Sequence, residues 1–196
     1  MIDYIKGQIV ELTPTYVVLE ANGLGYFISI PLPAYTLLSH QLEAKLFVHE
    51  VVREDAYLFF GFITKKEREV FQLLISVSGI GVNTARMIMS SYSVEEIQEI
   101  IAAGNVSALN AIKGIGSKTA QRIIVDLKDK ILKGKDDGGS LSLLSDKNAQ
   151  IKEEAVSALV MLGFPVGASQ KAIENILKEQ SQLEVEQLIK MALKIL

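Results

Sequence analysis

The stretch LISVSGIGVNTA at residues 74–85 recurs thirty-five residues later as LNAIKGIGSKTA at residues 109–120. Both copies fit the pattern L-x-x-h-x-G-I-G-x-x-T-A, where h is apolar, and each lies between two segments with helical periodicity. Paired glycines permit a tight turn, and the isoleucine between them is expected to pack inward between the flanking helices. The duplication therefore predicts two similar helical hairpins.

A hairpin of this kind is suited to hold a phosphate. The N–H groups that begin the following helix have no intrahelical acceptors, and the helix dipole places partial positive charge there. A phosphate oxygen satisfies both, and glycine lets a ligand approach the backbone closely. Lys118 adds a cation to the second copy, where the first has Asn83, and Arg86 and Arg122 follow on the two helices. The pattern resembles the helix-hairpin-helix motif, which holds nucleic-acid backbones without reading bases.

The glycine pairs are also compatible with two other kinds of site or turn. A dinucleotide-binding fingerprint requires a preceding strand and a βαβ unit, and here a helix precedes each pair. A plain helical corner would explain one copy, but two copies at matched positions favour a binding role. The segment around Gly116 is not a nucleotide-binding P-loop either, because Ser117 stands where that loop has its lysine. We therefore expect no nucleotide hydrolysis and no enzyme activity from this chain alone.

The first sixty residues alternate between apolar and polar side chains and are rich in Val, Ile, Tyr and Phe. Asn22-Gly23 predicts a two-residue hairpin turn, and Gly25 indicates a bulge or bend. We expect a small Greek-key barrel of OB type, with a minimal sandwich as the alternative. The five expected strands are Ile5 to Leu12, Tyr16 to Ala21, Leu24 to Ile30, Lys45 to Val52 and Ala56 to Phe62.

The pattern becomes helical from Thr64 onward, and the whole chain is expected to be an α+β multidomain protein. Ser93 to Glu96 and Ser181 to Glu184 each have the sequence of a helix-starting capping box. A Gly-, Ser-, Asp- and Lys-rich segment predicts a flexible linker before three final helices, which form a small UBA-like module. The expected divisions are a barrel at 1–63, the hairpin domain at 64–133, the linker at 134–149 and the module at 150–196.

Composition narrows the classes of function. Cysteine is absent and the only histidines are His40 and His49, so disulfides and cysteine-based zinc sites are excluded, and we expect no metal and no cofactor. The net charge is -3, but residues 64–134 hold ten Lys and Arg against seven Asp and Glu, whereas both flanking regions are net acidic. The N-terminus lacks a signal-peptide pattern, so we expect a soluble cytoplasmic protein.

The order of barrel, tandem hairpins, linker and three-helix module resembles the RuvA family, the Holliday-junction-recognition subunits, from end to end. The segments 51–56 and 58–62 look like the acidic-pin hairpin of that family, and 159–164 resembles its C-terminal signature. The resemblance implies a homotetramer, possibly an octamer on DNA, that binds four-way junction DNA and holds it open and planar. It also implies two protein partners, the RuvB hexameric ATPase and the RuvC resolvase.

The resemblance also assigns roles to individual residues. Glu54 and Asp55 would form the acidic pin that repels phosphates at the crossover, although from sequence alone they form an ordinary solvated turn. Leu159, Leu162 and Phe164 would contact the ATPase, although leucines at helical spacing are more often core residues, and Phe164 in the turn is expected to be the most exposed. The expected phosphate-binding residues are Gly79, Ile80, Gly81, Asn83, Thr84, Arg86, Lys113, Gly114, Ile115, Gly116, Ser117, Lys118, Thr119 and Arg122.

Asn83 and Ser117 stand where family members often carry lysines at the hairpins. Backbone amides are therefore expected to contribute more of the phosphate binding. Two other functions fit parts of the sequence. A helix-hairpin-helix glycosylase would use Asp126 or Asp129 as its catalytic acid, but the larger base-flipping fold is absent. A single-strand binder would use the barrel, but that region is net negative and shows no obvious aromatic platform.

Overall fold

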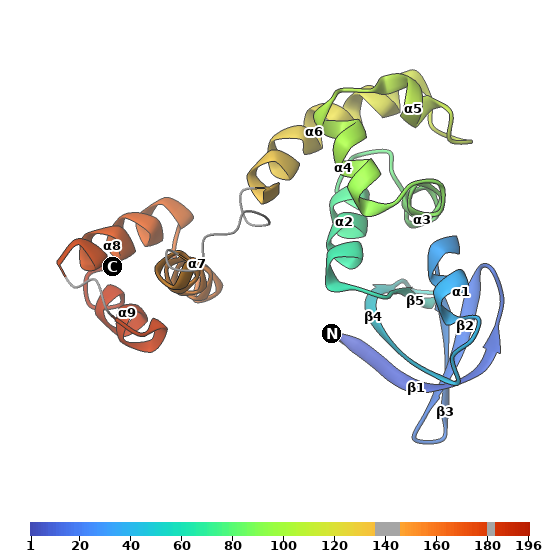
Figure 1. The fold of residues 1–196 in the computed structure, drawn as a ribbon, viewed down its shortest axis with the longest axis horizontal. Coiled ribbons are helices and arrows are strands. Elements are labelled where there is room, and N and C mark those ends of the chain that lie inside the picture. The colour runs from blue at the N-terminus through green and yellow to red at the C-terminus, as the bar shows by residue number, and fades with distance from the viewer. Residues whose placement is uncertain (136–145, 180–182) are drawn as a thin grey trace. The chain divides into compact units, whose positions relative to one another are not determined.

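The computed structural model of the chain describes residues 1–135, 146–179 and 183–196. It divides into two compact units, residues 1–138 and 139–196, which are described separately below (Figure 1). Helix α6 ends at Lys135 and helix α7 begins at Asp146. The predicted linker at 134–149 therefore overlaps both helices, and its central part lies outside the described residues.

A closed five-stranded barrel forms the N-terminal part of the first unit. Its strands pair in the order β1-β2-β3-β5-β4, with β4 returning to β1 and with β3 and β5 parallel. This confirms the OB-type barrel and excludes the sandwich, because the sheet has no open edge. The strands are β1 Tyr4–Leu12, β2 Tyr16–Ala21, β3 Leu24–Ser29, β4 Glu43–Val52 and β5 Tyr57–Phe62.

The turns of the barrel confirm one local prediction and overturn another. Asn22 and Gly23 both have positive φ, 53° and 77°, as the expected two-residue turn requires. Gly25, however, pairs in regular register with Glu20, and the bulge lies in β1 between Ile9 and Glu11. The short helix α1, Leu32–Leu38, was not predicted; it buries Leu38 against the barrel core.

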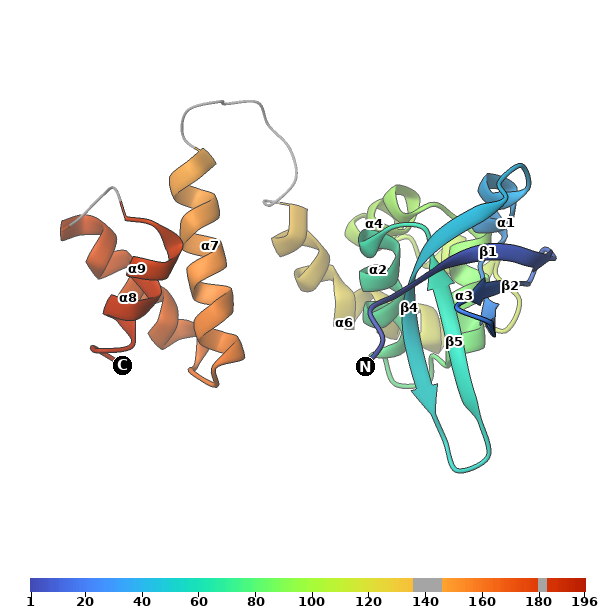
Figure 2. The same cartoon turned by 90° about the horizontal axis from the view of Figure 1, so that it is seen from below.

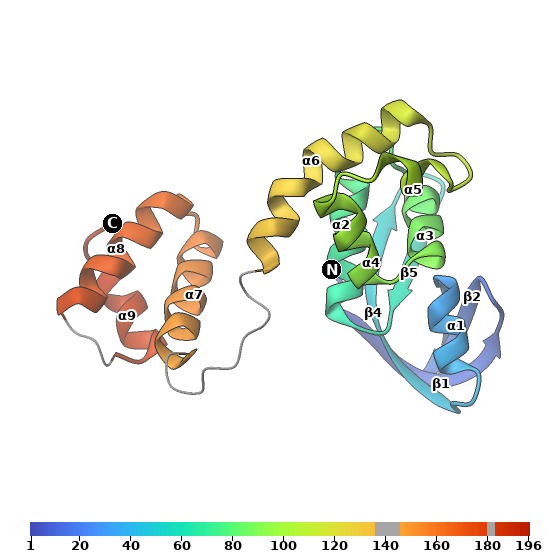
Figure 3. The same ribbon diagram turned by 45° about the horizontal axis from the view of Figure 1, so that its top comes forward.

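The helical part of the first unit follows the barrel directly (Figure 3). Its helices are α2 Lys65–Ile75, α3 Val82–Ser91, α4 Val94–Ala102, α5 Val106–Asn110 and α6 Ser117–Lys135. Thr64 and Glu67 cap α2, and Ser93 and Glu96 cap α4, each through a reciprocal pair of side-chain hydrogen bonds. The capping box predicted at Ser93 is therefore confirmed, and α2 begins with a second one.

Strand β5 joins the barrel to the helices. Phe59 lies in the barrel core, whereas Phe60 and Phe62 point to the other face of the strand and pack in the helical core with Phe71. Arg68 on α2 adds a polar link, since its Nη1 donates to both the carbonyl and the carboxylate of Asp3, each at 2.7 Å. The guanidinium holds the pKa of the Asp3 carboxyl below its usual value.

The second unit is a small helical bundle. Its helices are α7 Asp146–Met161, α8 Val166–Glu179 and α9 Val185–Ala192. Leu159, Ile173, Ile176 and Leu188 are buried in its core. Helix α9 begins at Val185 with Glu184 at the N-cap position and no side-chain cap, so the capping box predicted from Ser181 is wrong; Ser181 itself lies outside the described residues.

Candidate nucleic-acid interface

The two glycine-rich stretches adopt the same backbone turn. The first connects α2 to α3 and the second connects α5 to α6. Gly79 and Gly114 occupy the left-handed region, with φ of 95° and 89°, where a side chain would be strained. The turn is closed by a hydrogen bond from the N–H of the following isoleucine, to the carbonyl of Val77 at 3.0 Å in the first copy and to that of Ile112 at 3.1 Å in the second.

Ile80 and Ile115 are structural residues in this arrangement. Each side chain is only 5% exposed and lies in the helical core, as the sequence predicted. Each N–H already donates within its own turn. The prediction that these two residues bind phosphate is therefore corrected, because neither the side chain nor the amide is available to a ligand.

The second glycine of each pair is not required by the fold. Gly81 has φ -86° and ψ 167°, a conformation that any residue adopts. A Cβ built at Gly81 or at Gly116 would meet nothing within 4 Å. Neither the backbone conformation nor internal packing explains why these residues are glycines. What a side chain here would change is the open space beside the backbone.

The amides next to these glycines are free donors. Within the described residues, no N–H of residues 81–84 or 116–119 donates to an acceptor. The first turns of α3 and α6 also contain no acidic residue, whereas α2 has Glu67 and α4 has Glu95 and Glu96 in that position. Asn105 caps α5 by accepting a hydrogen bond from the N–H of Ala108. Three helix starts in the domain thus have side-chain caps, and the two at the hairpins offer N–H groups and positive dipole ends to an anion.

The cations predicted near the hairpins fall into two groups. Lys113 and Lys118 are exposed, and Lys118 lies at the start of α6. Arg86 and Arg122 already donate to main-chain carbonyls, Arg86 to Thr15 at 3.2 Å and Arg122 to Ser78 at 3.3 Å.

The two hairpins meet at a shared hollow. Its volume is about 430 Å³, and residues from both copies surround it. The first hairpin and the start of α6 thus lie side by side. The lining residues are Ser78, Gly79, Lys118, Thr119, Gln121 and Arg122. Asn83 and Ser117 are exposed, and Thr84 is partly buried.

The turn predicted as the acidic pin connects β4 to β5 at the end of a long hairpin (Figure 2). The N–H of Arg53 donates to the carbonyl of Ala56 at 2.8 Å, which closes the turn, and Glu54 and Asp55 are exposed between them. Glu50, further down β4, accepts a hydrogen bond from the Tyr57 hydroxyl, which lowers the pKa of its carboxyl. The two acids at the tip have no such partner in the described chain.

The three residues predicted to contact an ATPase differ in exposure. Leu159 is 0% exposed and belongs to the core of the second unit, so its assignment to a contact surface is wrong. Phe164 packs partly against the same core and is less exposed than expected. Leu162 is 60% exposed and is flanked by Met161 and Val166, which are also exposed. The sequence reasoning missed these two neighbours, although both are apolar residues beside the Gly163 turn.

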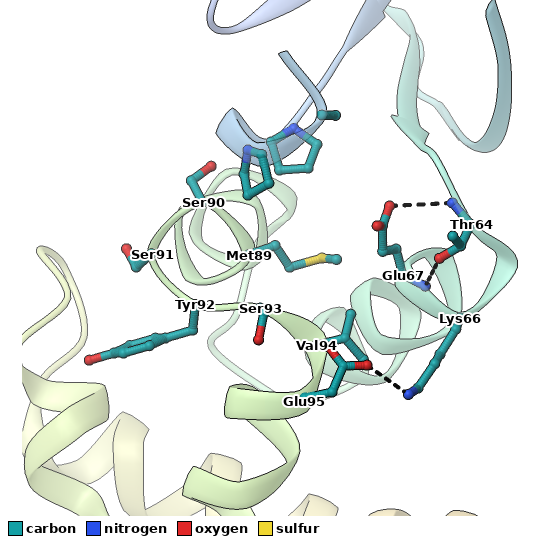
Figure 4. Close-up of a pocket in the computed structure, with 13 residues that line it drawn as sticks. Thr64, Lys66, Glu67, Met89, Ser90, Ser91, Tyr92, Ser93, Val94 and Glu95 are labelled. Atoms are coloured by element: carbon teal, nitrogen blue, oxygen red, sulfur yellow. Dashed lines mark hydrogen bonds and ion pairs between the residues drawn. The ribbon is translucent and has the colours of Figure 1, made fainter. Parts of the chain in front are cut away.

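A second hollow, of about 390 Å³, lies between α1 and the helices α2, α3 and α4 (Figure 4). Lys66 pairs with Glu95 at 2.9 Å on one side of it, and the Thr64–Glu67 capping box lies next to them. These polar groups satisfy one another rather than converge on the space between them. The described residues contain no cluster of His, Asp and Glu that could hold a metal ion, and none of their helices is long and apolar enough to cross a membrane.

The chain matches three family models, one for each of its parts. Residues 1–61 match the family model described as RuvA N terminal domain, residues 71–129 match SAM-like helix-hairpin-helix tandem, and residues 150–196 match RuvA C-terminal domain. The chain is 54% identical over 196 residues to the Holliday junction branch migration complex subunit RuvA of Parabacteroides distasonis, with full coverage of both chains. It is 51% identical to the same subunit of Bacteroides fragilis, with 99% of each chain covered. The chain is a member of the RuvA family.

Proposed function

We propose that this protein binds four-way DNA junctions structure-specifically through their phosphates, holds them open and planar, and recruits the RuvB hexameric ATPase for branch migration in recombination and repair. One observation carries the proposal: both hairpins present unpaired amides in an acid-free helix start, beside a glycine that the fold itself does not require. The related proteins are named as junction branch migration subunits, which supports the same conclusion.

The proposed grip is mainly electrostatic and independent of base sequence. Amides at residues 81–84 and 116–119, with Lys113 and Lys118 beside the second set, would each face the sugar-phosphate backbone. Contacts of this kind position a protein on DNA without reading bases. Discrimination between a junction and a linear duplex must then come from the placement of several subunits, so the proposal includes a homotetramer, with a second tetramer possible on the opposite face of the DNA.

Glu54 and Asp55 would act where the strands separate. They are exposed at the tip of the β4–β5 hairpin, so they can approach DNA without desolvating a partner. Two like charges about 4 Å apart repel by about 4 kcal/mol at an effective dielectric constant near 20. A repulsion of that size guides phosphates away from the crossover but supplies no net work. The work of branch migration must therefore come from a separate motor.

The second unit would recruit that motor through the exposed apolar residues Met161, Leu162 and Val166. Exposed apolar side chains gathered at one turn are typical of a protein contact. We also propose the RuvC resolvase as a further partner at the junction and the bacterial cytoplasm as the location, because the DNA lies there. The chain itself contributes binding and no nucleotide hydrolysis.

The test compares binding to a four-way junction, a linear duplex and a single strand without nucleotide. The proposal requires the junction to bind tightest, with a steep salt dependence. A Lys118→Gln variant should reduce the slope of log affinity against log salt by about 0.9 for each lost phosphate contact. Lys128→Gln is the matched control: it removes an exposed lysine ten residues along α6, about 15 Å from the hairpin. Equal affinity for all three DNAs would refute the proposal.

A further inference from the structure

Arg122 connects the two hairpins. It lies on α6, the helix that follows the second hairpin, yet its Nη1 donates to the carbonyl of Ser78 in the first hairpin at 3.3 Å. The two residues are 44 positions apart in sequence, and both line the hollow where the hairpins meet. The guanidinium thus spans from one copy of the motif to the other.

A reciprocal contact exists on the other side. The thirty-five-residue offset between the copies makes Met87 on α3 the counterpart of Arg122 on α6. Met87 lies against the second hairpin, since a Cβ built at Gly114 would be 3.8 Å from its Cε. Each hairpin's helix therefore reaches the opposite hairpin with the side chain at the same motif position. One is a hydrogen bond, and the other is the close approach of an apolar side chain to the glycine turn.

This spacing matters if both hairpins hold one duplex, so the inference rests on the proposed function. Phosphates on a duplex stand at fixed separations, and two sets of amides bind both strongly only when their own separation matches. We propose that Arg122 is a positioning residue, which holds the first hairpin against the second through the Ser78 carbonyl rather than binding a phosphate itself. The same guanidinium was expected from the sequence to reach DNA directly, and the two roles make different experimental predictions.

The first experiment needs no DNA. Amide hydrogen exchange is measured on the full-length protein for the N–H groups of Val77, Ile80 and Ala85, which donate to carbonyls in and next to the first hairpin. Arg122→Gln removes the bond to Ser78, so these amides should exchange about threefold to tenfold faster. Lys118→Gln is the matched control, since it neutralises a cation at the same hollow that makes no bond to the first hairpin, and it should leave exchange unchanged. The amides of Ile112 and Ile115 in the second hairpin provide an internal reference.

The second experiment measures junction affinity against salt concentration. Arg122→Gln should weaken binding about threefold to tenfold at every salt concentration with an unchanged slope, whereas Lys118→Gln should flatten the slope by about 0.9. If Arg122→Gln instead exchanges like the wild type and flattens the slope, Arg122 binds a phosphate and the positioning role is wrong. If neither variant affects DNA binding, the proposed function fails, but the exchange result still decides whether Arg122 holds the hairpin. Arg122→Lys, which keeps the charge, serves as a second variant if Arg122→Gln lowers the melting temperature.

Discussion

Replacing either glycine of the first hairpin by alanine should separate stability from DNA binding. Gly79 has φ 95°, so Gly79→Ala forces an L residue into a strained conformation at a cost of about 1–3 kcal/mol. Gly81 has φ -86° and open space around its missing Cβ. Gly81 is also the N-cap residue of α3, where glycine is preferred to alanine. This loss offsets the reduced freedom of the unfolded chain, so Gly81→Ala should change the free energy of unfolding by less than about 1 kcal/mol.

The two substitutions should affect the melting temperature differently. For a unit of this size, 1 kcal/mol corresponds to about 3 °C, so Gly79→Ala should melt about 3–9 °C lower and Gly81→Ala should melt within about 3 °C of the wild type. Differential scanning fluorimetry at one fixed protein concentration measures both, since subunit association adds to apparent stability. Fluorescence anisotropy with a labelled four-way junction then measures affinity on the same samples.

Gly81→Ala should bind the junction about tenfold or more weakly although its stability is nearly unchanged. The added methyl group occupies the space next to the free amides of residues 81–84, and losing one charged hydrogen bond costs about 1.5–3 kcal/mol. A Gly81→Ala protein that melts as low as Gly79→Ala would contradict the unstrained backbone conformation of Gly81. A variant that binds as tightly as the wild type would show that phosphates do not approach here.

Three further outcomes are expected. Leu159→Ala should destabilise the second unit by about 2–5 kcal/mol in urea unfolding, whereas the exposed Leu162→Ala should leave its stability unchanged and weaken capture of the ATPase in a pull-down. Burial holds the pKa of His49 below its ordinary value of 6.5, so on acidification His49 is protonated in the unfolded chain before it is protonated in the folded protein. The free energy of unfolding should therefore fall as the pH drops below about 6.5. His49→Gln should reduce this dependence on pH in urea titrations across the same range. Arg68→Met should lower the free energy of unfolding by about 1–2 kcal/mol in a thermal melt, because it removes the hydrogen bonds to Asp3, which is half-exposed.

The local parts of the fold could be predicted from the sequence because their causes are local. The paired glycines determine the hairpin turns, and Asn22-Gly23 determines a barrel turn through its positive φ values. The capping box at Ser93 is likewise contained in four residues. Helix α1 was missed because it is short and has a proline in its first turn, which breaks the helical pattern even though the fold tolerates it there.

The tertiary contacts of the long side chains could not be predicted from the sequence. Arg86 and Arg122 look like free cations along their helices, but their acceptors lie 71 and 44 residues away in sequence. Leu159 and Leu162 show the same limit, because helical spacing identifies both as apolar without saying which one faces the core. Only the packing of the second unit separates the buried leucine from the exposed one.

The side chains of β5 alternate between two hydrophobic cores, and this limits how the turn between β4 and β5 can vary. Phe59 and Gly61 face the barrel interior, where a Cβ at Gly61 would lie 2.5 Å from Cγ2 of Ile28, and Phe60 and Phe62 face the helices. Inserting one residue within this strand would exchange the two faces and disrupt both cores at once. Changes in the length of this turn are therefore confined to residues 53–56, beyond the last paired positions of β4 and β5. Such changes would alter how far Glu54 and Asp55 extend, whereas the direction of the hairpin is set by the two hydrophobic cores that β5 joins.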